Sequence, residues 1–112
     1  MSYDEKLAER LRETLQSREE ISERKMFGGL AFMSRGYMFI GINGATLMAR
    51  VGPGYYEQAL SRPHVRVMDF TGRPMKGYVF VDPPGFSSDS ELAEWAQRCH
   101  GFVQSLPPKK PG

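Results

Sequence analysis

The stretch Met26-Phe27-Gly28-Gly29-Leu30-Ala31-Phe32-Met33 is apolar and aromatic, and it is too short to cross a membrane. Through Ser34-Arg35-Gly36 it leads into a second apolar run, Tyr37 to Ile42, and Asn43-Gly44 separates that run from a third, Ala45 to Val51. Asn-Gly favours a hairpin turn because both positions tolerate a positive φ. The pattern therefore predicts three consecutive antiparallel strands, at roughly 25–33, 37–42 and 45–51, around which the rest of the chain packs.

Two details of these strands carry further predictions. Gly28-Gly29 lies inside the first predicted strand, where glycine indicates a bulge or a close approach by another backbone. Alternation along the second strand predicts two apolar faces, one with Met38, Ile40 and Ile42 and the other with Tyr37, Phe39 and Gly41. Because the helices of so short a chain are expected to cover one face only, we predict a homodimer that buries some of Tyr37, Phe39 or Met48.

The segment before the strands predicts a helix. Ser2 and Glu5 have the spacing of a capping box. An apolar residue then recurs every four positions, which is typical of an amphipathic helix of about four turns; the residues are Tyr3, Leu7, Leu11 and Leu15. Residues 18–25 are charged and are predicted to link this helix to the sheet.

The segment after the strands predicts a short helix at about 53–61, a strand at 64–70, a loop at 71–77 and a strand at 78–81. Ser88 and Glu91 form a second capping-box pattern that begins a last helix. We expect Trp95 of this helix to lie against the sheet with Phe102 and the Leu7/Leu11 stripe. The prediction is an α+β domain over residues 1–106, with helices packed on a five-stranded antiparallel sheet in the order α-β-β-β-α-β-β-α. A disordered polar tail is predicted at 107–112.

Composition narrows the class of protein. A chain of 112 residues has room for one domain with a single modest core. Cys99 is the one cysteine, so no intrachain disulfide is possible and a reducing cytoplasm is the expected location. The N-terminus has no signal-peptide pattern and no run suits a membrane span, so no membrane association is expected. The net charge is only +2, yet residues 26–81 hold six Lys/Arg and two Asp/Glu, so the predicted sheet region is basic.

Two blocks of the sequence carry a resemblance to a known family. They are Lys25-Met26-Phe27-Gly28-Gly29-Leu30 and Asp69-Phe70-Thr71-Gly72-Arg73-Pro74-Met75-Lys76-Gly77. With them, the chain resembles the TfoX N-terminal domain family, also called TfoX/Sxy-like, over roughly residues 10–106, and looks most like its short stand-alone members. The resemblance implies an α+β fold in the order given above and implies no catalytic residue. Longer relatives regulate natural competence with a cyclic-AMP receptor protein at promoters and carry a second, C-terminal helical domain, before which this chain is expected to end.

The polar residues form no recognisable catalytic or metal-binding sequence pattern. The soft ligands are Cys99, His100 and His64, and they show neither a Cys-x-x-Cys nor a His-x-x-x-His spacing, so no metal site and no cofactor are predicted. No spacing supports a nucleophile with a positioned base. Gly52-Pro53-Gly54 could hold an anion at the start of a helix, but it lacks the Gly-x-x-x-x-Gly-Lys pattern and is interpreted as a turn.

The basic segment supplies the candidate binding residues. Arg73 and Lys76 lie in the Gly- and Pro-containing loop at 71–77, which contains no carboxylate, and Arg50 and Arg66 extend the predicted site. Arginine suits a carboxylate or phosphate partner. Methionine fills gaps in cores and also suits adaptable binding surfaces, and both interpretations stay open for Met26, Met33, Met38, Met48, Met68 and Met75.

Three functions are compatible with this pattern. The first is a non-enzymatic regulatory or protein-interaction module with an unknown protein partner, as the family resemblance implies. The second is a nucleic-acid-binding protein that uses the basic middle segment, although weakly on its own. The third is a small-molecule-binding domain. The predicted site, Arg50, Arg66, Arg73 and Lys76, could serve an acidic protein or a single-stranded nucleic acid.

Overall fold

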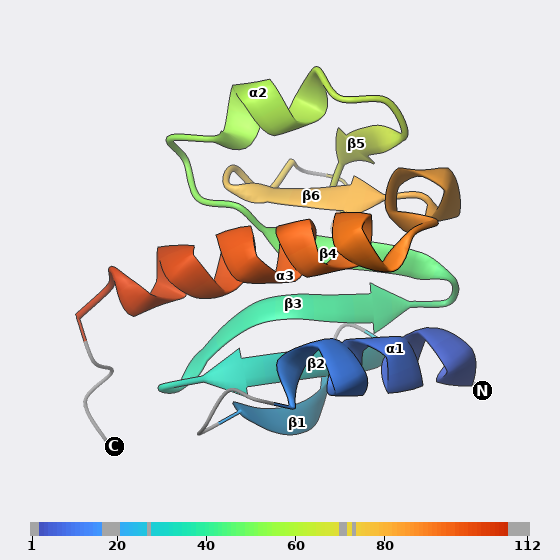
Figure 1. Ribbon diagram of the computed structural model, residues 1–112. Coiled ribbons are helices and arrows are strands. Elements are labelled where there is room, and N and C mark those ends of the chain that lie inside the picture. The colour runs from blue at the N-terminus through green and yellow to red at the C-terminus, as the bar shows by residue number, and fades with distance from the viewer. Residues whose placement is uncertain (1–2, 17–20, 27, 70–71, 73, 108–112) are drawn as a thin grey trace.

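The fold of the chain is a single sheet with helices on one side, as the computed structural model shows (Figure 1). Residues 3–16, 21–26, 28–69, 72 and 74–107 are described. In chain order the elements are α1 (Glu5–Leu15), β1 (Ile21–Met26), β2 (Gly29–Ser34), β3 (Tyr37–Asn43), β4 (Thr46–Arg50), α2 (Tyr56–Leu60), β5 (Val65–Val67), β6 (Tyr78–Val81), the 3-10 helix η1 (Pro83–Phe86) and α3 (Asp89–Gln104). All neighbouring strands are antiparallel, in the order β1-β2-β3-β4-β6-β5. None of the helices among the described residues is long and apolar enough to span a bilayer.

The main core lies between the sheet and the helices. In Figure 1, α1 and α3 lie across the same face of the sheet, and α2 lies beyond β6. Leu7 and Leu11 of α1 join this core, as the four-residue spacing predicted. Trp95 of α3 is 1% exposed in the same core, with Phe102 packed at its border, and its indole N–H donates to the Gly85 carbonyl at 3.2 Å. We refer to this as the helix-side core.

The prediction of five strands is wrong because a sixth, β1, was taken for a linker. The run predicted as one strand at 25–33 is a hairpin, β1 and β2, and Gly28 turns it with a φ of 73°. An edge strand needs few apolar residues, and four of the six residues of β1 are exposed. The close backbone approach predicted for the glycine pair is confirmed at Gly29, where a Cβ would lie 1.8 Å from the Ile42 carbonyl oxygen.

A bulge in β3 corrects the predicted alternation. Phe32 pairs with Ile40, whereas Met33 pairs with Met38, so Phe39 is an extra residue in β3. Phe39 and Ile40 consequently both enter the helix-side core, while Met38 packs on the opposite face. The extra residue breaks the period of two on which the prediction depended.

The structure also bears on the residues named for a homodimer. Phe39 and Met48 are fully buried within the single chain, and Tyr37 is half-buried. The homodimer stays a prediction, and of these three side chains Tyr37 is the one with surface to offer a second copy.

Several predicted boundaries shift. Helix α1 is capped by Asp4, whose carboxylate accepts the Lys6 backbone N–H at 2.9 Å, while Ser2 lies outside the described residues. The strand predicted at 64–70 is only the three-residue β5. It begins after His64, which has a φ of 67° and therefore cannot continue the extended backbone.

The predicted start of the last helix is confirmed, because Ser88 and Glu91 form a capping box at the start of α3.

The predicted tail begins with a residue that contacts the sheet. The Pro107 carbonyl accepts a hydrogen bond from the Tyr37 hydroxyl, and residues 108–112 lie outside the described part of the chain.

Candidate interaction face

The face of the sheet opposite the helices is covered by methionine. Its buried members are Ala31, Met38, Met48 and Met68, against which pack Met26, Met33, Met75, Tyr78 and Phe80. All six methionines of the described residues belong to this cluster, and no residue of a described helix does. We call this set the methionine face.

Strand register explains how the methionine face is assembled. Met33 and Met38 are directly opposite each other on β2 and β3, and Met48 on β4 is opposite Gly41 and Phe80. Gly41 leaves room for the Met48 side chain, whose Cε would lie 2.8 Å from a Cβ at that position. Methionine is unbranched and polarisable, so a cluster of methionines adapts its shape to what it contacts.

The segment 68–77 is attached to this face at both ends. Met68 is fully buried and Met75 half-buried in the methionine face, and the Met75 N–H donates to the Met68 carbonyl at 3.0 Å. The Gly77 carbonyl accepts the N–H groups of Val51 and Gly52 at 2.8 and 3.0 Å. These bonds fix the described ends of the loop that the sequence predicted as the binding site, and fixed ends lower the entropy that a partner must remove.

Arg50, the first predicted site residue, lies at one end of the methionine face. Its guanidinium carbon is 5.4 Å from the ring centroid of Tyr37, 5.3 Å from that of Tyr78 and 5.5 Å from that of Phe102. One nitrogen also donates to the Met38 carbonyl at 3.5 Å. Such cation–π contacts hold β3, β4, β6 and α3 together, so the geometry gives Arg50 a structural task.

Arg66, the second predicted site residue, projects from β5 on the side of the methionine face. It stacks over Phe80, with 4.8 Å from guanidinium carbon to ring centroid. It also makes a two-pronged ion pair with Asp82, at 3.1 Å from Nη2 to Oδ1 and 3.2 Å from Nε to Oδ2. With the Arg66 side chain 52% exposed, the pair stays in contact with solvent and is available to a partner carboxylate.

The loop at 71–77 and strand β1 supply the remaining cations. Lys76 is exposed and makes no ion pair with any described residue. Arg73 lies outside the described residues. The structure adds a cation that the sequence analysis missed, Arg24, which is exposed on β1 opposite Ala31 and so borders the methionine face. The alternation of Arg24 and Met26 was its signal, and it was hidden because this stretch was interpreted as a linker.

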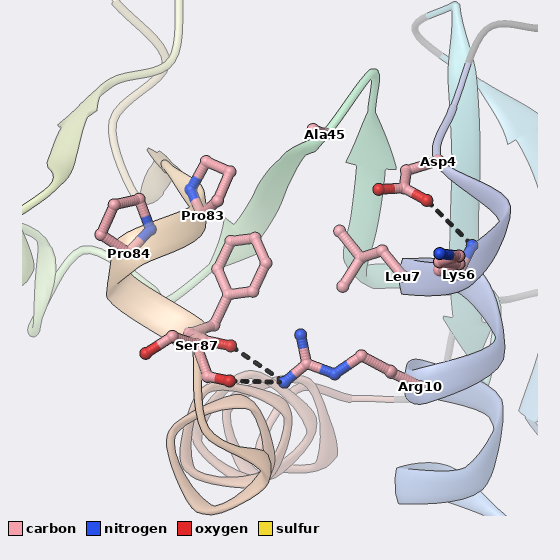
Figure 2. A pocket seen from close by; sticks show the side chains of 9 residues that line it. Asp4, Lys6, Leu7, Arg10, Ala45, Pro83, Pro84 and Ser87 are labelled. Carbon is pink, nitrogen blue, oxygen red and sulfur yellow. Dashed lines mark hydrogen bonds between the residues drawn. The ribbon is translucent and has the colours of Figure 1, made fainter.

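A cavity lies on the other side of the molecule, between α1 and η1 (Figure 2). Its volume is about 430 Å³, within the range of small-molecule sites. Leu7 and Phe86 supply apolar walls, and Lys6 and Arg10 are the cations of the lining. Figure 2 shows Arg10 reaching from α1 toward Ser87; its terminal nitrogen donates to the carbonyls of Phe86 and Ser87 at 3.0 and 3.5 Å. These bonds join α1 to η1, which gives the arginine a structural role whether or not a ligand binds.

The soft metal ligands of the chain are His64 and the adjacent Cys99 and His100 of α3. Within the described ranges, no three His, Cys, Asp or Glu side chains are grouped so as to hold a metal ion. Cys99 is fully buried, and desolvation raises the pKa of its thiol to about 12, which keeps it protonated near neutral pH. His100 is buried beside Ser34, with 3.4 Å between Nε2 and Oγ.

Comparison with known proteins places the chain in a family. The model of the TfoX N-terminal domain matches residues 13–103 of the 112-residue chain. Neither a search of curated proteins nor a search of solved structures gave a match. The matched range runs from within α1 almost to the end of α3 and therefore spans the whole sheet. The chain thus belongs to the TfoX N-terminal domain family.

Proposed function

We propose that this chain is a non-enzymatic regulatory module that acts by binding a protein partner through the methionine face and the adjoining segment 68–77. The observation that carries the proposal is the gathering of all six described methionines on the side of the sheet that the helices leave uncovered. Methionine-rich surfaces of this kind accommodate partners of varied shape. Membership of the TfoX N-terminal domain family supports a regulatory role linked to competence.

The charge around the methionine face indicates the chemistry of the partner. Arg24 and Lys76 are exposed cations, and Arg66 is exposed and paired to Asp82. Residues 26–81 hold six Lys/Arg against two Asp/Glu. An acidic protein surface with apolar side chains complements this arrangement, since complementary charges speed association and an apolar centre provides affinity. By resemblance to the longer relatives, we propose a partner that belongs to the transcription machinery.

The proposal is tested with a matched pair of charge reversals. Arg73→Glu with Lys76→Glu changes the loop, and Lys6→Glu with Lys25→Glu makes the same change of charge away from the methionine face. Lys6 and Lys25 are exposed, and Lys25 is opposite Leu30 of the helix-side core. Surface changes of this kind alter the free energy of unfolding by about 0.5 kcal/mol each.

Partners are captured from the native cell with the wild-type chain, identified, purified and titrated against all three proteins. We expect the loop variant to weaken binding at least about tenfold, because like charges then face an acidic partner, and the control variant to bind like the wild type. Equal binding by all three proteins would remove the loop from the site. Unfolding of the loop variant alone would make Arg73 or Lys76 a structural residue.

A nucleic-acid partner is the second candidate, favoured by the positive charge of residues 26–81. Binding through several phosphates falls steeply with salt concentration. Titration of a labelled single-stranded oligonucleotide at low and physiological salt distinguishes the candidates. A protein partner with an apolar contact area would lose much less affinity over the same change of salt.

A further inference from the structure

The methionines of the methionine face differ in their exposure to solvent. Met26, Met33 and Met75 are half-buried, whereas Met38, Met48 and Met68 are at most 5% exposed. Thioether sulfur is oxidised by peroxides in proportion to its exposure. The three half-buried residues are therefore the first that a peroxide in solution reaches.

Oxidation changes the chemistry of the side chain. The lone pair of the sulfur attacks one oxygen of hydrogen peroxide, the O–O bond breaks and an S–O bond forms. The proton on the transferred oxygen passes to the departing hydroxide, which leaves as water. Sulfur loses two electrons and the peroxide gains them. The product, methionine sulfoxide, is polar, and a polar group placed among apolar side chains without a hydrogen-bond partner is costly.

The position of Met75 links that change to two backbone hydrogen bonds. Its side chain packs in the methionine face beside the fully buried Met68, and its N–H donates to the Met68 carbonyl. Its carbonyl accepts the Tyr78 N–H at 3.0 Å. A sulfoxide that turns out to water moves the backbone that makes both bonds. The helix-side core contains no methionine among the described residues, so the same oxidant leaves it unchanged.

We infer that the methionine face is a site of reversible oxidation by peroxides, entered at Met26, Met33 and Met75, and that the oxidation breaks the backbone bonds of Met75 to Met68 and Tyr78. Reduction of the sulfoxides by methionine sulfoxide reductases restores these bonds. The inference needs no partner; only its consequence, that oxidation lowers partner affinity, rests on the proposed function.

The test measures oxidation and backbone protection on the isolated full chain. Hydrogen peroxide is added, peptide masses locate the sulfoxides, and amide hydrogen exchange is followed by NMR. We expect the three half-buried methionines to oxidise before the other three. The amides of Met75 and Tyr78 should then exchange about tenfold faster, while the amide of Leu92, which donates to the Ser88 carbonyl at the start of α3, stays unchanged.

A triple variant, Met26→Leu with Met33→Leu and Met75→Leu, supplies the control. Leucine keeps the apolar volume and removes the sulfur, so peroxide should leave the exchange of the Tyr78 amide unchanged. Treatment of the oxidised wild type with the reductases should restore slow exchange, and this arm decides the matter if the triple variant does not fold.

Three results would overturn the inference. The first is oxidation of Met48 as fast as that of Met75. The second is full oxidation of the three half-buried methionines without faster exchange at Met75 and Tyr78. The third is equal acceleration at Leu92, which would indicate global unfolding. Because no partner is present, none of these results depends on the proposed function.

Discussion

Leu47 and Met48 are neighbours on β4, both fully buried, and they lie on opposite faces of the same sheet. The helix-side core around Leu47 consists of aromatic and branched side chains with few rotamers, whereas the other face consists largely of methionine. Side chains with few rotamers fix one packing arrangement, and flexible ones allow several of similar energy. One sheet thus provides stability on one side and an adaptable surface on the other, and four predictions test how far this division extends.

The largest effect is expected at Trp95 on the helix side. Trp95→Ala removes a side chain that is 1% exposed and its hydrogen bond to the Gly85 carbonyl. It also removes the ring over which Arg62 stacks, with 4.2 Å between the guanidinium carbon and the ring centroid. We expect a loss of about 3–5 kcal/mol in the free energy of unfolding, measured by urea denaturation. Tyr56→Ala, at a half-buried position on α2, is the control and should cost much less. An unchanged midpoint for Trp95→Ala would contradict the packing described for α3.

The pair Leu47→Ala and Met48→Ala compares the two faces directly. Both changes empty a fully buried site on one strand. We expect about 3–4 kcal/mol for Leu47→Ala and about 2 kcal/mol for Met48→Ala, because neighbouring methionines move into the space more easily than rigid side chains do. Denaturation curves of the two variants give the comparison, and equal losses would mean that the methionine face is packed as rigidly as the other.

Gly41→Ala sharpens the same question. The new Cβ would lie 2.7 Å from the Leu30 carbonyl oxygen and 2.8 Å from the Cε of Met48. The carbonyl is fixed in the sheet, and the end of Met48 can move, so we expect a loss of about 1–3 kcal/mol from the backbone contact. A double-mutant cycle with Met48→Ala measures the coupling, which should be close to zero. Strong coupling would place the clash on Met48 and show that its side chain is held rigidly.

The smallest effect concerns Glu23, which accepts hydrogen bonds from Arg12 Nε and Nη2 at 2.8 and 2.9 Å and so ties β1 to α1. The hydrogen bond from Arg12 lowers the pKa of the Glu23 carboxyl below its ordinary 4.5. The stabilisation is therefore present above pH 4.5 and is lost as the pH falls through the lower value of the folded state.

With side chains 42% and 36% exposed, the pair is screened by solvent, and Glu23→Gln should cost less than about 1 kcal/mol at neutral pH. The urea midpoints of wild type and variant should differ at neutral pH and should converge well below pH 4.5, where the carboxyl is protonated. A gap between the two midpoints that persists in acid would assign the effect to something other than this carboxylate.

The sequence was informative wherever a local signal dictated local structure. The Ser88/Glu91 capping box and the buried stripe of α1 are confirmed, and so is the α+β class. The hairpin predicted at Asn43-Gly44 is also confirmed, but Asn43 pairs with Thr46, so the turn itself is Gly44-Ala45 and the positive φ is that of Gly44. Strand β1 was missed because an exposed edge strand resembles a charged linker. The bulge at Phe39 was missed because nothing in the residues of β3 marks where a partner strand skips a position.

The candidate site shows the same limit. Its cations were found from composition, and their role in binding stays a prediction. The surface between them was not foreseen, because six methionines spread from 26 to 75 come together only through strand register. Contacts of Arg50 with three rings and of Arg66 with Asp82 are likewise products of the tertiary fold.

The charged residues of strand β1 protect the edge of the sheet against aggregation between copies of this chain. It is the outer strand of the sheet, and its outer backbone groups form a template to which another strand could add. Three consecutive charged residues, Glu23, Arg24 and Lys25, occupy its centre and are exposed. The opposite edge, β5, offers only three residues. Both edges therefore disfavour strand addition and aggregation, and association is directed to the broad faces of the molecule.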